Sequence, residues 1–301
     1  MTRLFPAAIL ALLLTAGPAL ADTPPGLTFE NNVTYSTVGS VKLRMDIVKP
    51  GTPGPHPGIL LIHGGSWRAG SKNMFQPFLS GFGEAGFVAC AVQYRLSPKH
   101  KWPAHVDDVK AAVRWMRDNA RDLDLDPKRI ASLGFSAGGH LALMLGVMDE
   151  EEGKTPFKVQ TVINWFGPTD LTKLDSKTVR EFLGARLDEK PEVWKGASPL
   201  NHISPDDPPV LTLHGRKDRL VPVSQATRLH AALKKAKVES KIVLMDAGHG
   251  WGGKMLMDSL KQTKAFLLKH LGDGARAKKA KPADKPKAVP ETPKTPKKRF
   301  F

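Results

Sequence analysis

A serine flanked by two glycines is the feature of this sequence with the clearest chemical content. It lies in the segment Gly134–Gly138, which reads Gly-Phe-Ser-Ala-Gly. A strand-like apolar run at 129–133 precedes it and a helical pattern at 139–145 follows, so Ser136 falls on a strand-to-helix turn. Such a turn strains the serine backbone, and a side chain at either flanking glycine would collide with neighbouring backbone. The pattern predicts a nucleophile elbow with Ser136 as nucleophile; a glycine-rich turn without chemistry is the alternative that this motif alone leaves open.

A serine nucleophile needs a base that takes its proton and an acid that orients the base. His249 is the predicted base because it lies in a glycine-flanked loop, 246–251, after the last strand-like run. The other late histidines, His230 and His270, fall within helical patterns, where a solvated position is the ordinary interpretation. We therefore expect the imidazole of His249 to face Ser136.

The predicted acid is Asp218. The strand-like run 210–213 leads into the segment His214–Asp218, so this carboxylate follows a strand end and can reach an imidazole above the sheet. The competitor is Asp170, which follows the preceding strand and could instead cap the first helix of the next segment. We favour Asp218, which makes the order along the chain serine, aspartate, histidine.

Backbone donors for a developing oxyanion are expected in the segment His63–Ser66, directly after a buried strand. Its two glycines allow backbone N–H groups to turn toward a substrate oxygen. Together with the N–H group of Ala137, those of Gly65 and Ser66 would form an oxyanion hole, in which one donor typically contributes about 3 to 4 kcal/mol. His63 is expected to support this loop, because in this order the base comes last.

Alternating strand-like and helical patterns predict the scaffold: an α/β fold with a mostly parallel central sheet flanked by helices. In such sheets ligands bind beyond the carboxyl ends of the strands, where the residues above fall. The segment Gly167–Pro209 is too long for a plain connection, so we expect a helical insertion that forms a lid or pocket wall. After early antiparallel strands, of which 43–48 is the clearest, the predicted strands are 58–62, 87–94, 129–133, 159–166, 210–214 and 241–246, and the predicted helices 73–84, 104–119, 139–145, 224–235 and 254–271.

The two ends of the chain differ from the single domain predicted at residues 22–274. Residues 1–21 carry Arg3, an apolar run and small residues before Asp22, the pattern of a secretory signal peptide, which predicts a secreted or periplasmic protein. Residues 275–301 contain ten Lys or Arg, two acids and five prolines, which predicts a disordered tail. This tail supplies half of the formal net charge of +16, so we expect no nucleic-acid partner; the tail could contact anionic surfaces or simply solubilise the protein.

Cys90 is the only cysteine, so no intrachain disulfide is possible. It lies in the apolar run 88–92, which predicts a core residue rather than a nucleophile. No histidine or carboxylate cluster has the spacing of metal ligands, and acyl transfer by a serine needs none. We therefore expect neither a metal nor a cofactor.

With these motifs in place, the sequence resembles the α/β-hydrolase superfamily, and within it the esterases related to hormone-sensitive lipase and the bifunctional deacetylase/feruloyl esterase-like group. The resemblance implies the α/β-hydrolase fold and hydrolysis of a carboxylic ester through an acyl-enzyme, with Ser136 as nucleophile and Asp218 orienting His249. Lipase-like members usually carry a third glycine where this chain has Ser66, which favours the deacetylase/feruloyl branch. The segments that carry the resemblance are 63–67, 94–98, 102–104, 134–139, 214–218 and 248–250.

The expected substrate is a short acyl or feruloyl ester, including esters of plant polysaccharides. Trp67 and Trp251 lie near predicted strand ends, so we interpret them as substrate-binding residues on the wall of an acyl or sugar pocket, with a plain core position as an equal alternative. Tyr94, Arg95 and Asp108 are expected to form a structural polar network beside the elbow rather than to bind substrate.

Two other functions compete with an esterase. A serine peptidase of the prolyl-oligopeptidase type shares the elbow and the residue order, but such enzymes usually carry a propeller domain before the hydrolase domain. A catalytically silent module could use the basic tail to bind a polyanion. The presence of all three residues of the predicted triad argues against the silent module. The oligomeric state and the natural alcohol are not predicted.

Overall fold

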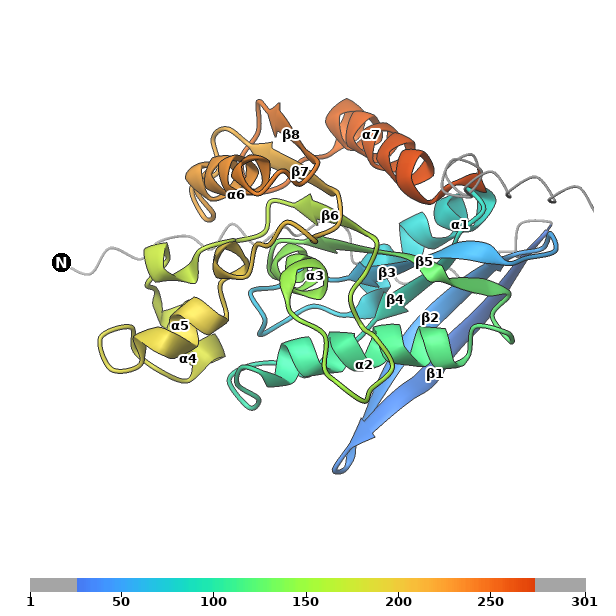
Figure 1. The fold of residues 1–301 in the computed structure, drawn as a ribbon, viewed down its shortest axis with the longest axis horizontal. Helices are drawn as coiled ribbons and strands as arrows, with labels where there is room; N and C mark the ends of the chain where they lie inside the picture. Colours follow the sequence, from blue (N-terminus) through green and yellow to red (C-terminus); the bar gives the residue numbers. More distant parts are fainter. Residues whose placement is uncertain (1–25, 274–301) are drawn as a thin grey trace, which may run out of the picture.

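An eight-stranded sheet forms the centre of the computed structural model, which describes residues 26–273 (Figure 1). The strands are β1 Leu27–Val38, β2 Val41–Pro50, β3 His56–Ile62, β4 Val88–Val92, β5 Leu125–Phe135, β6 Thr161–Trp165, β7 Val210–Gly215 and β8 Ser240–Met245. Their order across the sheet is β1-β2-β4-β3-β5-β6-β7-β8, with the first two pairs antiparallel and all later pairs parallel. The mostly parallel sheet expected from the sequence is confirmed. The predicted signal peptide and basic tail lie outside the described residues.

Burial explains why the central strands read as continuous apolar runs. Every residue of β4 and of β6 is buried, as expected for strands covered by helices on both faces. At the edge of the sheet, β1 is largely exposed. Cys90 lies at the centre of β4, and burial raises the pKa of its thiol, which is therefore a protonated core residue as predicted.

Helices cover both faces of the sheet, and alternate residues of β3 show which helices cover which face. Leu60 and Ile62 belong to one buried cluster with α2 Ala104–Asp118, α3 Ala137–Val147 and α6 Ser224–Lys235. Ile59 and Leu61 belong to a second cluster with α1 Gln76–Glu84 and α7 Gly253–Leu271. None of the helices described between residues 26 and 273 is long and apolar enough to cross a membrane. A 3-10 turn, η1, spans Lys72–Phe75 just before α1.

The segment Gly167–Pro209 is a helical insertion between β6 and β7, as predicted. Its buried residues, including Phe182 and Trp194, pack into the same hydrophobic cluster as α2 and α3. The insertion is thus continuous with the core on that face of the sheet. Its elements are η2 Leu171–Lys173, α4 Lys177–Leu183, α5 Pro191–Gly196 and η3 Pro199–Asn201.

A buried arginine near the start of β5 fastens the end of α7 to the sheet. The guanidinium of Arg129 donates to the carbonyl oxygens of Leu271 and Pro55 and to the carboxylates of Asp126 and Asp273, at 2.8 to 2.9 Å. These bonds lie at the amino-terminal edge of the parallel strands, opposite the edge where β5 ends at Phe135 and Ser136 follows.

Candidate active site

Ser136 occupies a sharp turn between the end of β5 and the start of α3. Its φ of 54° and ψ of −118° lie outside the ordinary regions for a residue with a side chain. Its amide donates to the carbonyl of Trp165 on β6 at 2.9 Å. A Cβ at Gly134 would overlap the carbonyl of Gly138, and one at Gly138 would overlap that of Ile62. The prediction that both flanking positions require glycine is confirmed.

His249 lies between Ser136 and Asp218, which come from loops far apart in the sequence. Its Nε2 is 2.8 Å from Oγ of Ser136 and its Nδ1 is 2.7 Å from Oδ2 of Asp218. Because an ionised carboxylate only accepts, Nδ1 carries the hydrogen, and Nε2 is left to accept from the serine hydroxyl. The ring of Phe166 lies edge-on to the imidazole, with centroids 4.9 Å apart. The structure therefore brings together the three residues predicted for proton transfer and nucleophilic attack.

The carboxylate of Asp218 is buried and satisfied on both oxygens. Oδ1 accepts from the amides of Leu220 and Val221, and Oδ2 accepts from His249 and lies 3.4 Å from Nε2 of His214. Burial alone raises the pKa of Asp218, but the nearby imidazole of His214 and the hydrogen bond from His249 outweigh burial and hold the pKa below its ordinary value. The carboxylate of Asp218 is therefore ionised near neutral pH, where it accepts the hydrogen bond from His249.

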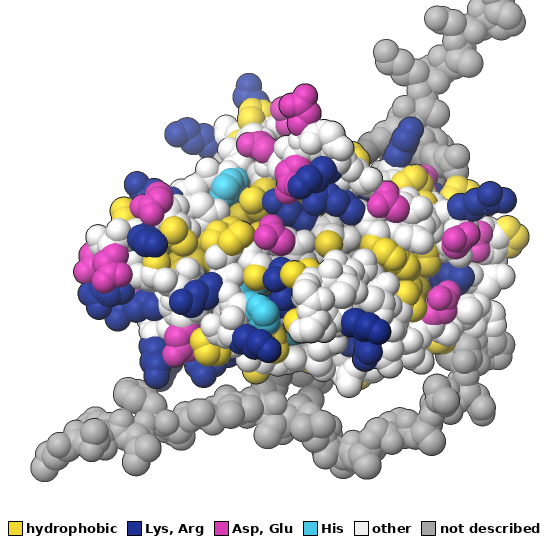
Figure 2. All heavy atoms as spheres, turned by 90° about the horizontal axis from the view of Figure 1, so that it is seen from below, with side chains coloured by type: hydrophobic (Ala, Val, Ile, Leu, Met, Phe, Trp, Pro, Cys, Tyr) yellow, Lys and Arg dark blue, Asp and Glu magenta, His cyan; other side chains and the backbone are white. Residues whose placement is uncertain are grey.

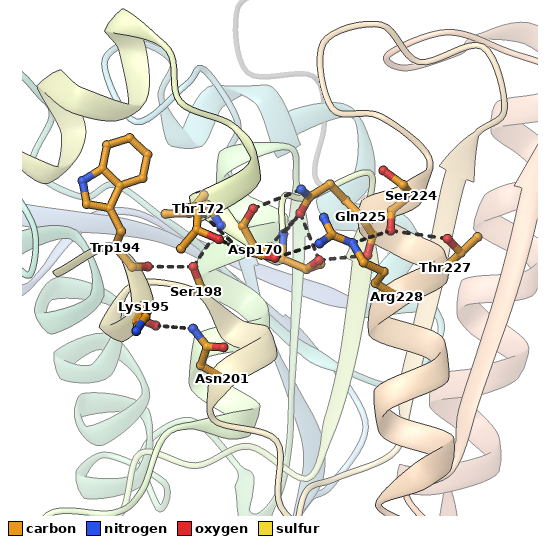
Figure 3. A network of polar contacts seen from close by, with 12 residues as sticks. Asp170, Thr172, Trp194, Lys195, Ser198, Asn201, Ser224, Gln225, Thr227 and Arg228 are labelled. Carbon is orange, nitrogen blue, oxygen red and sulfur yellow. Dashed lines mark hydrogen bonds and ion pairs between the residues drawn. The ribbon is translucent and has the colours of Figure 1, made fainter. Parts of the chain in front are cut away.

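The competing acid, Asp170, has a structural role (Figure 3). Its side chain accepts from the amide of Thr172 at 3.1 Å, which caps η2, and it pairs with Arg228 of α6 at 2.8 Å. The amide side chain of Gln225 accepts from the backbone N–H groups of Thr169 and Asp170 at 2.8 and 2.7 Å. These bonds join the insertion to α6 and occupy Asp170 away from His249, so the capping alternative is the observed one.

The loop after β3 passes directly beside the elbow. A Cβ built at Gly64 would lie 3.5 Å from Cβ of Ser136. Among the described residues, no hydrogen-bond acceptor is recorded for the amides of Gly65, Ser66 or Ala137. Ala137 is the first residue of α3, where amides have no partner within the helix. The three predicted donors are thus unpaired in the described structure, and their use in an oxyanion hole is part of the function proposed below.

Buried polar groups pack against the loop after β3, residues 63–67. The hydroxyl of Tyr94 donates to the carbonyl of His63 at 2.9 Å, and the two rings stack with centroids 4.2 Å apart. Burial lowers the pKa of His63 to about 4, so its imidazole is neutral near pH 7. Arg95 and Asp108 form a close pair at 2.7 Å. These positions agree with the structural roles expected for all four residues.

The two tryptophans interpreted as substrate-binding residues have different surroundings. Trp67 is only 4% exposed and stacks on Phe182 of α4, so its position does not support an open pocket wall. Trp251 is half-buried and lies edge-on to Phe166, with centroids 5.2 Å apart. Because Phe166 also contacts the imidazole of His249, Trp251 remains beside the site.

Three residues near the site were not predicted to contribute: Phe166, His140 and His214. His140 is four residues after Ser136 on α3, a spacing that places both residues on the same side of the helix and could have pointed to it. His214 lies within a segment quoted for the resemblance and approaches the carboxylate of Asp218. No sequence signal indicated Phe166, whose φ of 43° is unusual for an aromatic residue.

Charges of both signs are interspersed over the face shown in Figure 2, with apolar side chains between them. That face carries no continuous basic patch of the kind that binds nucleic acid. Within residues 26–273, no three His, Cys, Asp or Glu side chains are grouped so that they could hold a metal ion.

Comparisons with known proteins point to one family. A family model described as BD-FAE matches residues 45–233. The probable carboxylic ester hydrolase LipM of Mycobacterium tuberculosis is 35% identical over 240 residues, which make up 70% of this chain and 55% of the relative. Esterase LipQ of the same organism is 32% identical over 194 residues, covering 60% of this chain and 46% of the relative. The chain spans about half the length of these curated relatives.

Solved structures of esterases are also similar to this chain, and the similarity covers more of their length. Esterase Est2 of Thermogutta terrifontis, with propionate bound, matches with a TM-score of 0.71 and 30% identity, covering 81% of this chain and 94% of that chain. A truncated carbohydrate esterase from gut microbiota matches with a TM-score of 0.68 and 26% identity, covering 81% and 96%.

Proposed function

Because the chain belongs to the BD-FAE family, among the hormone-sensitive-lipase-like esterases of α/β-hydrolase fold, we propose that it is a serine carboxylic-ester hydrolase. The observation that carries the proposal is the pair of short contacts through His249, 2.8 Å to the serine hydroxyl and 2.7 Å to the carboxylate of Asp218. A hydroxyl in this arrangement can lose its proton as it attacks a carbonyl carbon.

In the proposed reaction, Nε2 of His249 accepts the proton of Ser136 while Oγ bonds to the carbonyl carbon of the ester. The negative charge that develops on the carbonyl oxygen is stabilised by the N–H groups of Gly65, Ser66 and Ala137. The imidazolium then gives its proton to the leaving alcohol, which produces an acyl-enzyme. A water molecule, deprotonated by the same imidazole, attacks the acyl carbon. The bond from that carbon to Oγ then breaks, the imidazolium returns its proton to Oγ of Ser136, and the acid is released.

Labelling with a fluorophosphonate, followed by mass mapping, tests the nucleophile. We expect one adduct, on Ser136, and loss of both labelling and p-nitrophenyl acetate hydrolysis in Ser136→Ala, with a fall in kcat of about a millionfold. A label on another residue, or turnover that survives in Ser136→Ala, would contradict the proposal.

The finer proposal concerns the substrate: a short acyl or feruloyl ester, including esters carried by polysaccharides. It is supported by the similarity to a carbohydrate esterase and by the aromatic side chain of Trp251 beside the site. Release of acetate from acetylated xylan, or of ferulate from a feruloylated arabinose ester, is the expected result. Activity on simple aliphatic test esters with none on these substrates would exclude the polysaccharide proposal.

We also propose that the protein is exported, on the pattern of residues 1–21, and that residues 275–301 are not needed for hydrolysis. The mature amino terminus should be Asp22 in protein recovered from the periplasm or medium. A chain that ends at Gly274 should retain its turnover of a small soluble ester. Loss of turnover in this shortened chain would favour a tail-dependent activity instead.

A further inference from the structure

Three consecutive residues of the loop beside the elbow have left-handed backbone conformations. Gly65, Ser66 and Trp67 have φ angles of 115°, 56° and 58°. Glycine adopts such angles readily, whereas serine and above all tryptophan do so at a cost. Strain of this kind persists only where the surrounding structure holds the backbone in place. The amides of this strained turn include two of the three proposed oxyanion donors.

Contacts of Trp67, two through its indole ring and one through its backbone carbonyl, supply much of that restraint. Its ring stacks on Phe182 of α4, with centroids 4.2 Å apart and an interplanar angle of 12°. Its indole N–H donates to Nδ1 of His140 at 3.2 Å, and its carbonyl accepts from the amide of Ser97 at 2.8 Å. The tryptophan is therefore fixed by three independent contacts, none of them with solvent.

His140 has the protonation pattern that the indole requires. Its Nε2 donates to the carbonyl of Ala197, at the end of α5, at 2.7 Å, so Nδ1 is free to accept. Burial lowers the pKa of His140 to about 4, which keeps the ring neutral. The amide of His140 also donates to the carbonyl of Ser136 at 3.0 Å. One imidazole thus connects the insertion, the elbow helix and the tryptophan of the loop.

The insertion that supplies Phe182 and Ala197 is itself anchored on its other side. The bonds between Gln225 of α6 and the backbone of Thr169 and Asp170 fasten the start of the insertion (Figure 3). The insertion can therefore act as a fixed support for Trp67.

We propose that Trp67 is a positioning residue: clamped between Phe182 of the insertion and His140 of the elbow helix, it holds the Gly65 and Ser66 amides at the oxyanion. This inference rests on the proposed esterase function and assigns to the insertion the task of setting the donor geometry. Misplacement of donors by less than an ångström weakens stabilisation of the transition state more than binding of the substrate. Losing the clamp should therefore lower kcat and leave KM nearly unchanged.

Substitutions can separate the two halves of the clamp. Trp67→Phe keeps an aromatic ring against Phe182 and removes the N–H donor; Phe182→Leu removes the stacking and keeps the donor. We expect each to lower kcat for p-nitrophenyl acetate by about tenfold to a hundredfold. Trp194→Phe is the matched control, because Trp194 is a buried tryptophan like Trp67 but lies within the insertion, and its indole N–H has no hydrogen-bond partner among the described residues.

Affinity for a trifluoromethyl ketone distinguishes positioning from general loss of structure. Such a ketone forms a tetrahedral oxyanion adduct with the serine, so its Ki should rise in Trp67→Phe by the factor by which kcat/KM falls. His140→Gln can still donate to Ala197, and the double variant Trp67→Phe/His140→Gln should lose little more than the stronger single variant, because both remove one bond. Melting temperatures of all variants identify any that fail to fold, and Phe182→Leu then carries the test.

A kcat in Trp67→Phe no lower than in Trp194→Phe, or a loss confined to KM, would overturn the inference. Wild-type protein that neither hydrolyses esters nor becomes labelled at Ser136 would instead remove the proposed function. The two failures are therefore distinguishable.

Discussion

The two sides of Ser136 are built from different interactions. On the donor side, residues 63–67, the backbone is strained and is held by buried aromatic rings and neutral imidazoles. On the proton-transfer side, formed by the loops of Asp218 and His249, the contacts are short hydrogen bonds to one ionised carboxylate. Packing fixes where a backbone amide lies, whereas hydrogen bonds to a carboxylate fix which nitrogen of an imidazole carries the proton. Packing therefore sets the positions of the amides on the donor side, and hydrogen bonds to Asp218 set the protonation of His249 on the proton-transfer side.

The largest expected effect is on the proton-transfer side. Asp218→Asn replaces an acceptor with an amide that can favour the wrong tautomer of His249, and kcat for p-nitrophenyl acetate should fall by about ten-thousandfold. Asp170→Asn is the control: Asp170 caps η2 and pairs with Arg228, so the change should cost about 1 to 2 kcal/mol of unfolding free energy and little kcat. An equal loss of kcat in Asp170→Asn would undo the assignment of the acid.

A smaller effect is expected where the two sides meet, at Gly138. A methyl group there would overlap the carbonyl of Ile62, the last residue of β3 before the donor side. Gly138→Ala should lower the free energy of unfolding by about 1 to 3 kcal/mol, measured in urea, and should also lower kcat because the elbow moves. Gly81→Ala, on α1 with nothing within 4 Å of the new methyl group, should instead stabilise the protein by about 0.5 to 1 kcal/mol. Equal behaviour of the two variants would show that the close approach is not maintained.

Lowering the pH should remove stability from the donor side before it affects the carboxylate of the proton-transfer side. His105 of α2 is a third buried imidazole on the donor side, with its ring centroid 4.8 Å from that of Phe182. Burial lowers the pKa values of His63, His105 and His140 to about 4, 3 and 4, so the unfolded chain takes up these protons near pH 6.5 before the folded protein does. The stability contributed by the neutral rings is complete above about pH 6.5 and is lost as the pH falls toward 4. For a fully buried imidazole this amounts to about 2 kcal/mol between pH 7 and pH 5.

Urea unfolding at pH 7 and pH 5 measures this loss. His140→Gln should show a smaller difference between the two pH values than the wild type. Asp218→Asn should leave the difference unchanged, because the lowered pKa of Asp218 keeps its carboxylate ionised throughout this range. A wild-type protein equally stable at both pH values would contradict the buried neutral imidazoles.

Much of the proton-transfer side could be anticipated from the sequence, because its residues follow strands that the apolar pattern locates. Parallel strands end at one edge of the sheet, so Ser136 after β5, Asp218 after β7 and His249 after β8 are gathered there by topology. The first and last residues of the strands were harder to predict. For example, β5 begins at Leu125 rather than at 129, because its first residue pairs with His56 of β3.

The donor side could be anticipated only in part. Two glycines after a strand indicate a turn, but the environment of Trp67 depends on Phe182, a residue more than a hundred positions away in an insertion with no periodic pattern of its own. The equal weight given to core and pocket for Trp67 reflects that limit. Contacts made through side-chain packing between distant segments leave no local signature, whereas strand ends do.

The arginine that fastens α7 to the sheet has a practical consequence for attaching this protein to a solid support. Arg129 lies in the first half of β5 and Ser136 directly follows its last residue, seven positions further on, or roughly 23 Å at about 3.3 Å per residue. A linker joined at Asp273 would leave the molecule at the edge held by Arg129. Immobilisation through that point would turn the serine outward, toward an insoluble polymer, while coupling through surface lysines would orient it at random.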